Sequence, residues 1–278
     1  MRSLVLCADD FGLSPGVSRG IADLARTGRL SAVSCMSISP DFTPSAPLLE
    51  GLHGRCDIGL HLTLTALAPL GPMPTLAPDG RLPSLGVLMR RLVLNRPPVQ
   101  EIAEELQRQL SRFVSILGRM PDFVDGHQHI HILPRVRQAL IALFESGQLD
   151  RTRIYVRDCY EPPWRVLRRG VAVRRALAIS VLSMPLHGEA RRRAIRTNRG
   201  FSGINDFSRQ DDYRTLFRRF LRDSGPQPLV MCHPGHPDEA LVGRDPVVAR
   251  RADEQAYFAG DAFVEDLAEA GYRLQRFG

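Results

Sequence analysis

The chain has 278 residues, of which 44% are hydrophobic and 24% charged, an ordinary composition for a globular protein with a sizeable core. All 37 basic residues are arginine, which excludes lysine Schiff-base catalysis, a lysine-anchored pyridoxal cofactor and a lysine-containing phosphate loop. The formal net charge of +7 is local, because residues 165–199 hold most of the excess arginine and one acid, Glu189.

The five cysteines are scattered and form no C-x-x-C pair, so neither a disulfide framework nor a cysteine zinc site is expected. The first apolar run is too short for the core of a signal peptide, and no apolar stretch approaches membrane-spanning length. These features predict a cytoplasmic protein.

The first predicted element is a short apolar run, residues 4–8, which is typical of a strand buried on both faces. Two adjacent carboxylates, Asp9 and Asp10, follow where this strand should leave the core, and Ser14-Pro15 predicts the start of a helix. Taken alone, such an Asp-Asp pair more often shapes a turn than a site. In α/β proteins, however, the loop after a strand is where the chemistry usually lies.

Strands and helices alternate along the rest of the chain. The expected strands are 32–38, 57–64, 123–131 running into a loop, 154–156, 229–232 and 272–276. The expected helices are 16–27, 44–52, 85–94, 99–117, 134–146, a surface helix at 171–184, 211–222 and two that begin at Pro246 and Asp261. The proline-rich loop 66–86 is either a lid or rim at the substrate site or a surface insertion.

This alternation implies a parallel sheet with right-handed crossovers. Six to eight such units favour one α/β domain over residues 1–278, folded as an irregular (β/α) barrel with a basic insertion at about 160–205. An open doubly wound sheet is the alternative.

Histidines gather at the predicted strand ends. His61 lies on the small, polar face of its strand, three more follow the strand at 123, and His233 follows the strand 229–232. In a parallel sheet these ends lie at one edge together with Asp9 and Asp10. One carboxylate and two imidazoles suit a divalent cation with open positions for water and substrate.

Asp10, His61 and His127 are the expected ligands of one divalent ion, either Zn²⁺ or Mg²⁺. Adjacent strand residues point to opposite faces, so Asp9 should be free to act as a base beside the ion. An extended segment would place His127, His129 and His131 on one face, whereas a helical one would pair only His127 with His131. His131 is therefore the alternative third ligand.

Four motifs in order, Ala8-Asp-Asp-Phe-Gly12, Gly59-Leu-His-Leu62, Asp125-Gly-His-Gln-His-Ile-His131 and Met231-Cys-His-Pro234, resemble those of the YdjC-like carbohydrate deacetylases. The resemblance spans nearly the whole chain. It implies a deformed barrel, a divalent metal and removal of N-acetyl groups from amino sugars. It also implies metal ligands at Asp10, His61 and His127, a catalytic base at Asp9 and a motif histidine at His233, the candidate acid for the leaving amine.

The basic insertion looks more like the hopanoid-biosynthesis-associated branch of this family, which implies an N-acetylglucosaminyl lipid in place of a chitooligosaccharide. The segment 165–199 is expected either to contact an anionic membrane surface or to form a solvated arginine-rich face. The expected substrate contacts are Arg157 and His129, and the resemblance favours a homodimer.

Two other functions remain open at this point. A metal-dependent phosphoesterase on a similar barrel would need more carboxylates than the sequence places at the site. A non-enzymatic binder of anionic surfaces or nucleic acid would rely on the basic segment, but only Trp164 and Phe201 flank it, so nucleic acid is not expected as a partner.

Overall fold

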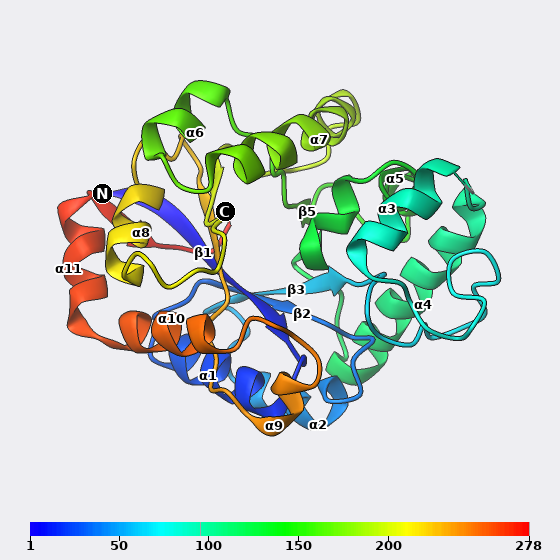
Figure 1. Cartoon of the computed structure of the whole chain (residues 1–278), viewed down its shortest axis with the longest axis horizontal. Helices are drawn as coiled ribbons and strands as arrows, with labels where there is room; N and C mark the ends of the chain where they lie inside the picture. The colour runs from blue at the N-terminus through cyan, green and yellow to red at the C-terminus, as the bar shows by residue number, and fades with distance from the viewer. Residues whose placement is uncertain (95, 278) are drawn as a thin grey trace.

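The computed structural model describes residues 1–94 and 96–277, and its parallel sheet curls into an incomplete barrel (Figure 1). The strands are β1 (Arg2–Phe11), β2 (Ala32–Cys35), β3 (Asp57–Leu62), β4 (Phe123–Gly126), β5 (Tyr155–Val156), β6 (Phe201–Ser202), β7 (Leu229–Cys232) and β8 (Tyr272–Leu274). Their order is β5-β4-β3-β2-β1-β7-β6, with β8 beside the start of β1. From β1 to β5 each strand pairs with the strand that precedes it in the chain, so the sheet grows in one direction, as in a barrel. This order confirms the predicted irregular (β/α) barrel.

A closing segment, residues 196–202, crosses the gap between β5 and β7. The Val156 amide donates to the Arg196 carbonyl at 2.9 Å, and Val156 forms a parallel bridge with Thr197. Arg199 then pairs with Gln227, and β6 continues alongside β7. The barrel wall is thus completed by irregular backbone rather than by a direct pairing of β5 with β6.

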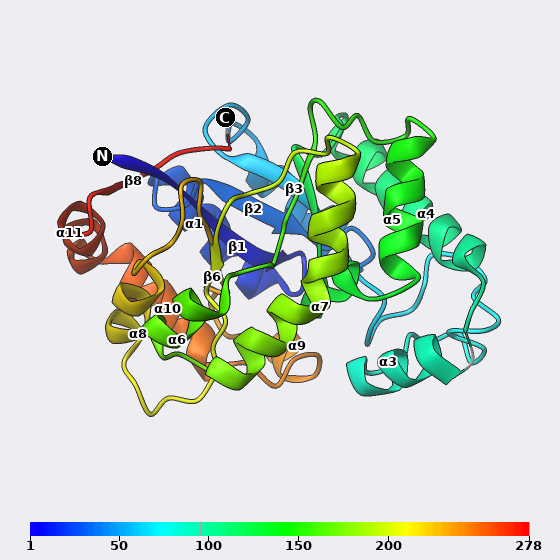
Figure 2. The same ribbon diagram turned by 90° about the horizontal axis from the view of Figure 1, so that it is seen from above.

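The helices lie on the outside of the sheet (Figures 1 and 2). They are α1 (Pro15–Arg26), α2 (Phe42–Ser45), α3 (Leu85–Leu94), α4 (Val99–Leu117), α5 (Val136–Glu145), α6 (Pro163–Arg169), α7 (Val173–Arg192), α8 (Tyr213–Phe220), α9 (Glu239–Val242), α10 (Ala249–Ala259) and α11 (Asp261–Glu269), with single turns η1 (Ala46–Leu49) and η2 (His127–Ile132). The helix expected at 171–184 extends through Arg192, whereas α6, α9 and β6 were not expected. The basic segment forms α6, α7 and the closing segment.

Aromatic rings pack closely where β3, β4 and β5 meet. An added Cβ on Gly59 would lie 2.4 Å from the Phe123 ring, so this position in β3 has room only for glycine. Phe123 stacks on Tyr155 at 5.0 Å between centroids, and Tyr155 stacks on Phe277 at 4.1 Å. The C-terminal residues are thereby held against the barrel.

The proline-rich loop 66–86 is anchored to α4. Glu101 accepts hydrogen bonds from the backbone amides of Thr75 and Leu76, and Glu105 accepts one from Leu70. Leu76 is fully buried. The loop is therefore part of the folded body rather than a loose surface insertion.

None of the helices in residues 1–94 and 96–277 is both long and apolar enough to cross a membrane.

Candidate active site

The two aspartates at the end of β1 point in different directions. Asp10 has a φ of 73°, and the register with β2 shifts between Ala8 and Phe11. A non-glycine residue in this left-handed region is costly unless its surroundings fix it. As a result Asp9 points to Arg157, while Asp10 points to His61 and His127.

Asp10, His61 and His127 converge as the sequence predicted, and each offers a ligand atom within 4.8 Å of the others. The Oδ1 atom of Asp10 lies 2.8 Å from His127 Nδ1 and 3.3 Å from His61 Nε2. Asp10 and His61 are buried, whereas His127 is partly exposed. A carboxylate oxygen and two imidazole nitrogens in this arrangement fit a divalent metal ion, with an open side for water or substrate.

Further polar groups hold the three side chains in place. Asp125 Oδ1 lies 2.7 Å from His61 Nδ1, and Ser34 donates to the same oxygen at 2.5 Å. Arg251 donates to the other oxygen of Asp10, Oδ2, at 2.6 Å. Carboxylates behind an imidazole fix its tautomer and orientation in metal sites. Burial disfavours a charge on His61, but Asp125 and Asp10 outweigh it and raise its pKa to about 10.

Asp9 is held by a buried ion pair beside the triad. Arg157 donates to its two oxygens at 2.7 and 2.5 Å and also lies 2.6 Å from Asp125 Oδ2. Burial opposes ionisation of Asp9, yet Arg157 holds the pKa of this carboxyl well below its usual range. Arg157 is 0% exposed, so it has no surface with which to contact a substrate. Its place in the site is to orient Asp9, and this corrects the expected substrate contact.

The histidine-rich segment is neither an extended strand nor a continuous helix. Gln128 and His129 both have positive φ, 53° and 59°, which turns the backbone sharply between His127 and His131. His131 is therefore buried behind the site, where its Nε2 lies 3.0 Å from the Arg157 carbonyl, and it does not belong to the ligand cluster. His127, not His131, supplies the third ligand atom in this arrangement.

His129, the other expected substrate contact, is 9% exposed and packs edge-on against Phe201 at 5.8 Å between centroids. Burial keeps its pKa well below the usual value, so its imidazole is neutral. A contact with substrate stays a prediction for this residue.

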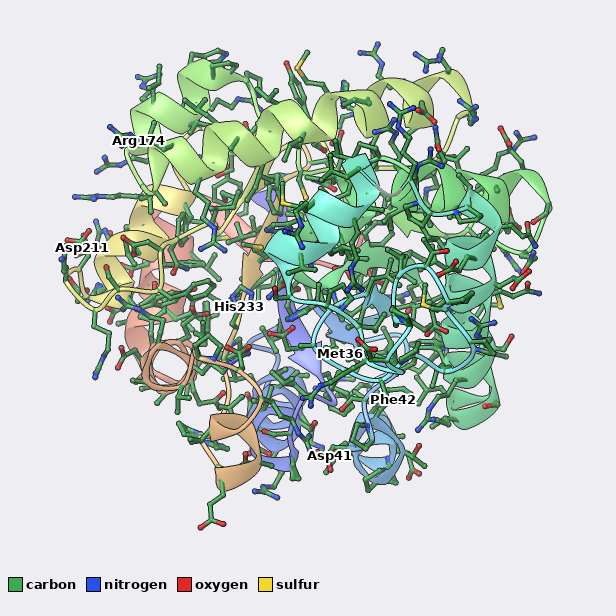
Figure 3. All side chains as sticks on the ribbon, turned by 45° about the vertical axis from the view of Figure 1, so that its right-hand side comes forward. Met36, Asp41, Phe42, Arg174, Asp211 and His233 are labelled. Carbon is green, nitrogen blue, oxygen red and sulfur yellow. The ribbon has the colours of Figure 1, made fainter. Side chains whose placement is uncertain are left out.

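His233 lies near the middle of the molecule, after β7 (Figure 3). Its backbone amide donates to Glu254 Oε2 at 2.6 Å, and its ring meets Phe207 edge-on at 5.2 Å. Burial lowers the pKa of His233 to about 4 and raises that of Glu254 to about 7. The nearby charges of Asp9 and Asp10 partly offset this effect on the imidazole.

Three supporting residues were not assigned from the sequence. Asp125 lies within the Asp-Gly-His motif, and its position before the histidines was the available signal. Arg251 and Glu254 belong to α10, far from any motif in the sequence. No pattern in the sequence indicates that an arginine of this helix binds Asp10 or that a glutamate of this helix accepts from the His233 amide.

Residues 3–269 match the model of the family described as YdjC-like protein. Chitooligosaccharide deacetylases from Escherichia fergusonii and Enterobacter sp. are 29% and 31% identical to this chain, which covers 97% and 98% of their lengths respectively. The alignments include 98% and 99% of this chain.

Among solved structures, a putative cellobiose-phosphate cleavage protein from Enterococcus faecalis V583 matches with a TM-score of 0.75 at 20% identity. The match covers 99% of this chain and 97% of that one. This likeness supports the barrel fold independently of the sequence motifs. On the family match and the full-length relatives, the chain belongs to the YdjC-like protein family.

Proposed function

We propose that the protein is a metal-dependent hydrolase that removes the N-acetyl group from an amino sugar. The convergence of Asp10, His61 and His127 next to the arginine-held Asp9 carries this proposal. The naming of full-length relatives as chitooligosaccharide deacetylases gives further support.

When bound at the triad, a divalent ion would polarise the acetamide carbonyl and lower the pKa of an attacking water. Asp9 is ionised at neutral pH and can accept a proton from that water, since Arg157 keeps its carboxylate form favoured. The weak basicity that follows from its low pKa also lets Asp9 release the proton readily.

His233, whose imidazole interacts electrostatically with Asp9 and Asp10, is the group that can donate a proton to the departing amine. Because burial keeps this imidazole neutral near pH 7, the proton it donates must first reach it from the attacking water. Asp9 passes the proton that it took from water to His233, which gives it to the amine, while the hydroxyl stays on the acetyl carbon. The product leaves as acetic acid, which ionises to acetate and a proton in solution.

The structure argues against the phosphoesterase alternative, which usually gathers two or more metals. Cys7, Asp9 and Asp125 form a second group of ligand-type atoms. Arg157, however, lies 2.5 Å from Asp9 and 2.6 Å from Asp125, so a guanidinium already occupies the place that a second cation would take. A single metal ion fits the remaining donors.

For the substrate we propose a soluble chitooligosaccharide first and an N-acetylglucosaminyl lipid second. The relatives' names favour the oligosaccharide. The lipid stays in view because α6 and α7 expose apolar side chains among their arginines: Trp164 and Leu167 are 53% and 60% exposed, and Val181 is 62% exposed.

Acetate release, with metal added, from N-acetylglucosamine, chitobiose and an N-acetylglucosaminyl lipid tests the proposal. Release that stops in Asp9→Asn would establish the deacetylase, and the preferred compound would choose between the two substrates. A metal-loaded protein that releases no acetate from any of them would refute the deacetylase proposal.

A further inference from the structure

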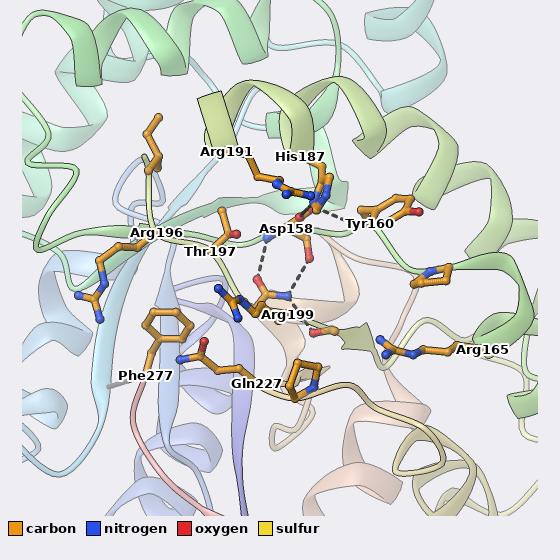
Figure 4. Close-up of a pocket in the computed structure, with 15 residues that line it drawn as sticks. Asp158, Tyr160, Arg165, His187, Arg191, Arg196, Thr197, Arg199, Gln227 and Phe277 are labelled. Carbon is orange, nitrogen blue, oxygen red and sulfur yellow. Dashed lines mark hydrogen bonds and ion pairs between the residues drawn. The ribbon is translucent and has the colours of Figure 1, made fainter. Parts of the chain in front are cut away.

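A cavity of about 640 Å³ is lined by residues that include none of Asp9, Asp10, His61, His127 and His233 (Figure 4). It is bounded by the C-terminal half of α7, the closing segment 196–202, Gln227 and Phe277. Two consecutive residues divide between the cavity and the candidate active site: Arg157 donates to Asp9, while Asp158 lines the cavity.

The cavity carries positive charge that the protein itself does not neutralise. Arg191 of α7 and Arg199 of the closing segment line it, both are exposed, and among the described residues neither side chain has a hydrogen-bond or ion-pair partner. Figure 4 shows that they approach the cavity from different sides. Arg165, which is paired with Glu161 at 3.0 Å, and Arg196, which lies over the Phe277 ring, bring the guanidiniums in the lining to four.

Asp158 is the acid in the cavity lining, and its oxygens are already committed. Oδ1 accepts from the Tyr160 amide at 2.9 Å and the Ser183 hydroxyl at 3.1 Å. Oδ2 lies 2.5 Å from His187 Nδ1. Among the residues that the structure describes, Asp158 forms no ion pair with Arg191 or Arg199.

The remaining lining suits a small polar molecule with a ring. Phe277 and Tyr160 supply aromatic surface, and Thr197 and Gln227 supply hydroxyl and amide groups. The volume falls in the range of small-molecule sites. Two unpaired guanidiniums match the charge and the several oxygens of a phosphate dianion better than a single carboxylate.

We propose that this cavity binds the phosphate group of a phosphate ester, at a site distinct from the one that hydrolyses acetamides. The phosphate could be carried by a soluble sugar phosphate or by a lipid headgroup, because Trp164 and Leu167 of α6 expose apolar surface next to Arg165.

Isothermal titration of the full-length protein with inorganic phosphate and glucose 6-phosphate, together with flotation of phosphatidylglycerol vesicles, tests this site. The double variant Arg191→Gln/Arg199→Gln should weaken binding at least about tenfold, because it removes two charge-assisted hydrogen-bonding groups. Arg192→Gln, an exposed neighbour on the same helix that does not line the cavity, is the matched control and should change the affinity less than about twofold.

Binding by His61→Ala should equal that of the unaltered protein, which distinguishes this cavity from the metal triad. Binding of the soluble ester assigns the phosphate to a metabolite, and binding of vesicles alone assigns it to a lipid. The proposal is overturned if no probe binds, if the double variant binds as tightly as Arg192→Gln, or if His61→Ala abolishes binding.

Discussion

Arg157 links two carboxylates with different tasks, since it donates to Asp9 and also lies within ion-pair distance of Asp125, which stands behind His61. Removing one partner from a buried ion pair is costly because the other charge is left unpaired. Asp9 and the cluster of Asp10, His61 and His127 therefore have different roles in the proposed reaction, but Arg157 stabilises both.

Asp9→Asn should keep metal binding and lose turnover by at least about 100-fold, because an amide cannot accept the proton from water. His61→Ala should lose both metal and turnover, because it removes a ligand. Metal content by elemental analysis and acetate release measure the two effects. Equal metal loss in both variants would contradict the division of roles, and melting temperatures show whether either variant is unfolded.

Glu254 gives a prediction on pH. Its pKa is raised by burial to about 7 from an unfolded value near 4.5, so the folded state holds a proton that the unfolded state has released. Stability should fall as pH rises from about 4.5 through 7. In Glu254→Gln this part of the fall should vanish, a relative gain of up to about 3 kcal/mol between pH 5 and 8.

Urea unfolding of both proteins at pH 5 and pH 8 measures that difference, with the exposed Glu50→Gln as control. A glutamine can still accept the hydrogen bond from the His233 amide, so the backbone contact should survive. Identical pH dependence in Glu254→Gln and the unaltered protein would show that Glu254 titrates normally.

At the scale of elements, β3 and β4 are locked together through Gly59. Because an added Cβ would meet the Phe123 ring at 2.4 Å, Gly59→Ala must displace a ring that also stacks on Tyr155. We expect a loss of about 1–3 kcal/mol in the free energy of unfolding. Gly86→Ala is the control, since its Cβ would meet nothing within 4 Å. If both variants unfold at the same denaturant concentration, the ring is not fixed.

The apolar strands and the side chains at their ends were predictable from sequence, because alternation and burial dictate where a parallel strand stops. Asp10, His61 and a histidine in the segment after β4 follow from that rule. The choice between His127 and His131 did not, since it depends on left-handed backbone at Gln128 and His129, which no hydrophobic pattern signals. Arg157 was predicted to contact substrate, whereas in the structure it pairs with Asp9 and Asp125. The sequence does not show which charges pair in the interior.

At the scale of the molecule, the proposed ion would join β1, β3 and the turn after β4. A ligand that binds only the folded state stabilises it by about 2.7 kcal/mol at a hundredfold excess over Kd, which corresponds to a rise of roughly 5–10 °C in Tm. Adding Zn²⁺ or Mg²⁺ to chelated protein should give this rise in a thermal scan. His61→Ala should show none, and a rise of equal size in that variant would place the ion elsewhere.

The linked ion pairs around Arg157 and Arg251 have a consequence for electroneutrality. Four carboxylates, on Asp9, Asp10, Asp125 and Asp245, surround these two guanidiniums. With His61 neutral, as a metal ligand must be, the formal charge of this group is −2. One divalent ion brings this interior to zero, whereas two would leave an excess that the buried surroundings tolerate poorly. These charges therefore favour a single divalent ion at the proposed site, which would leave neutral surroundings suited to an uncharged amide.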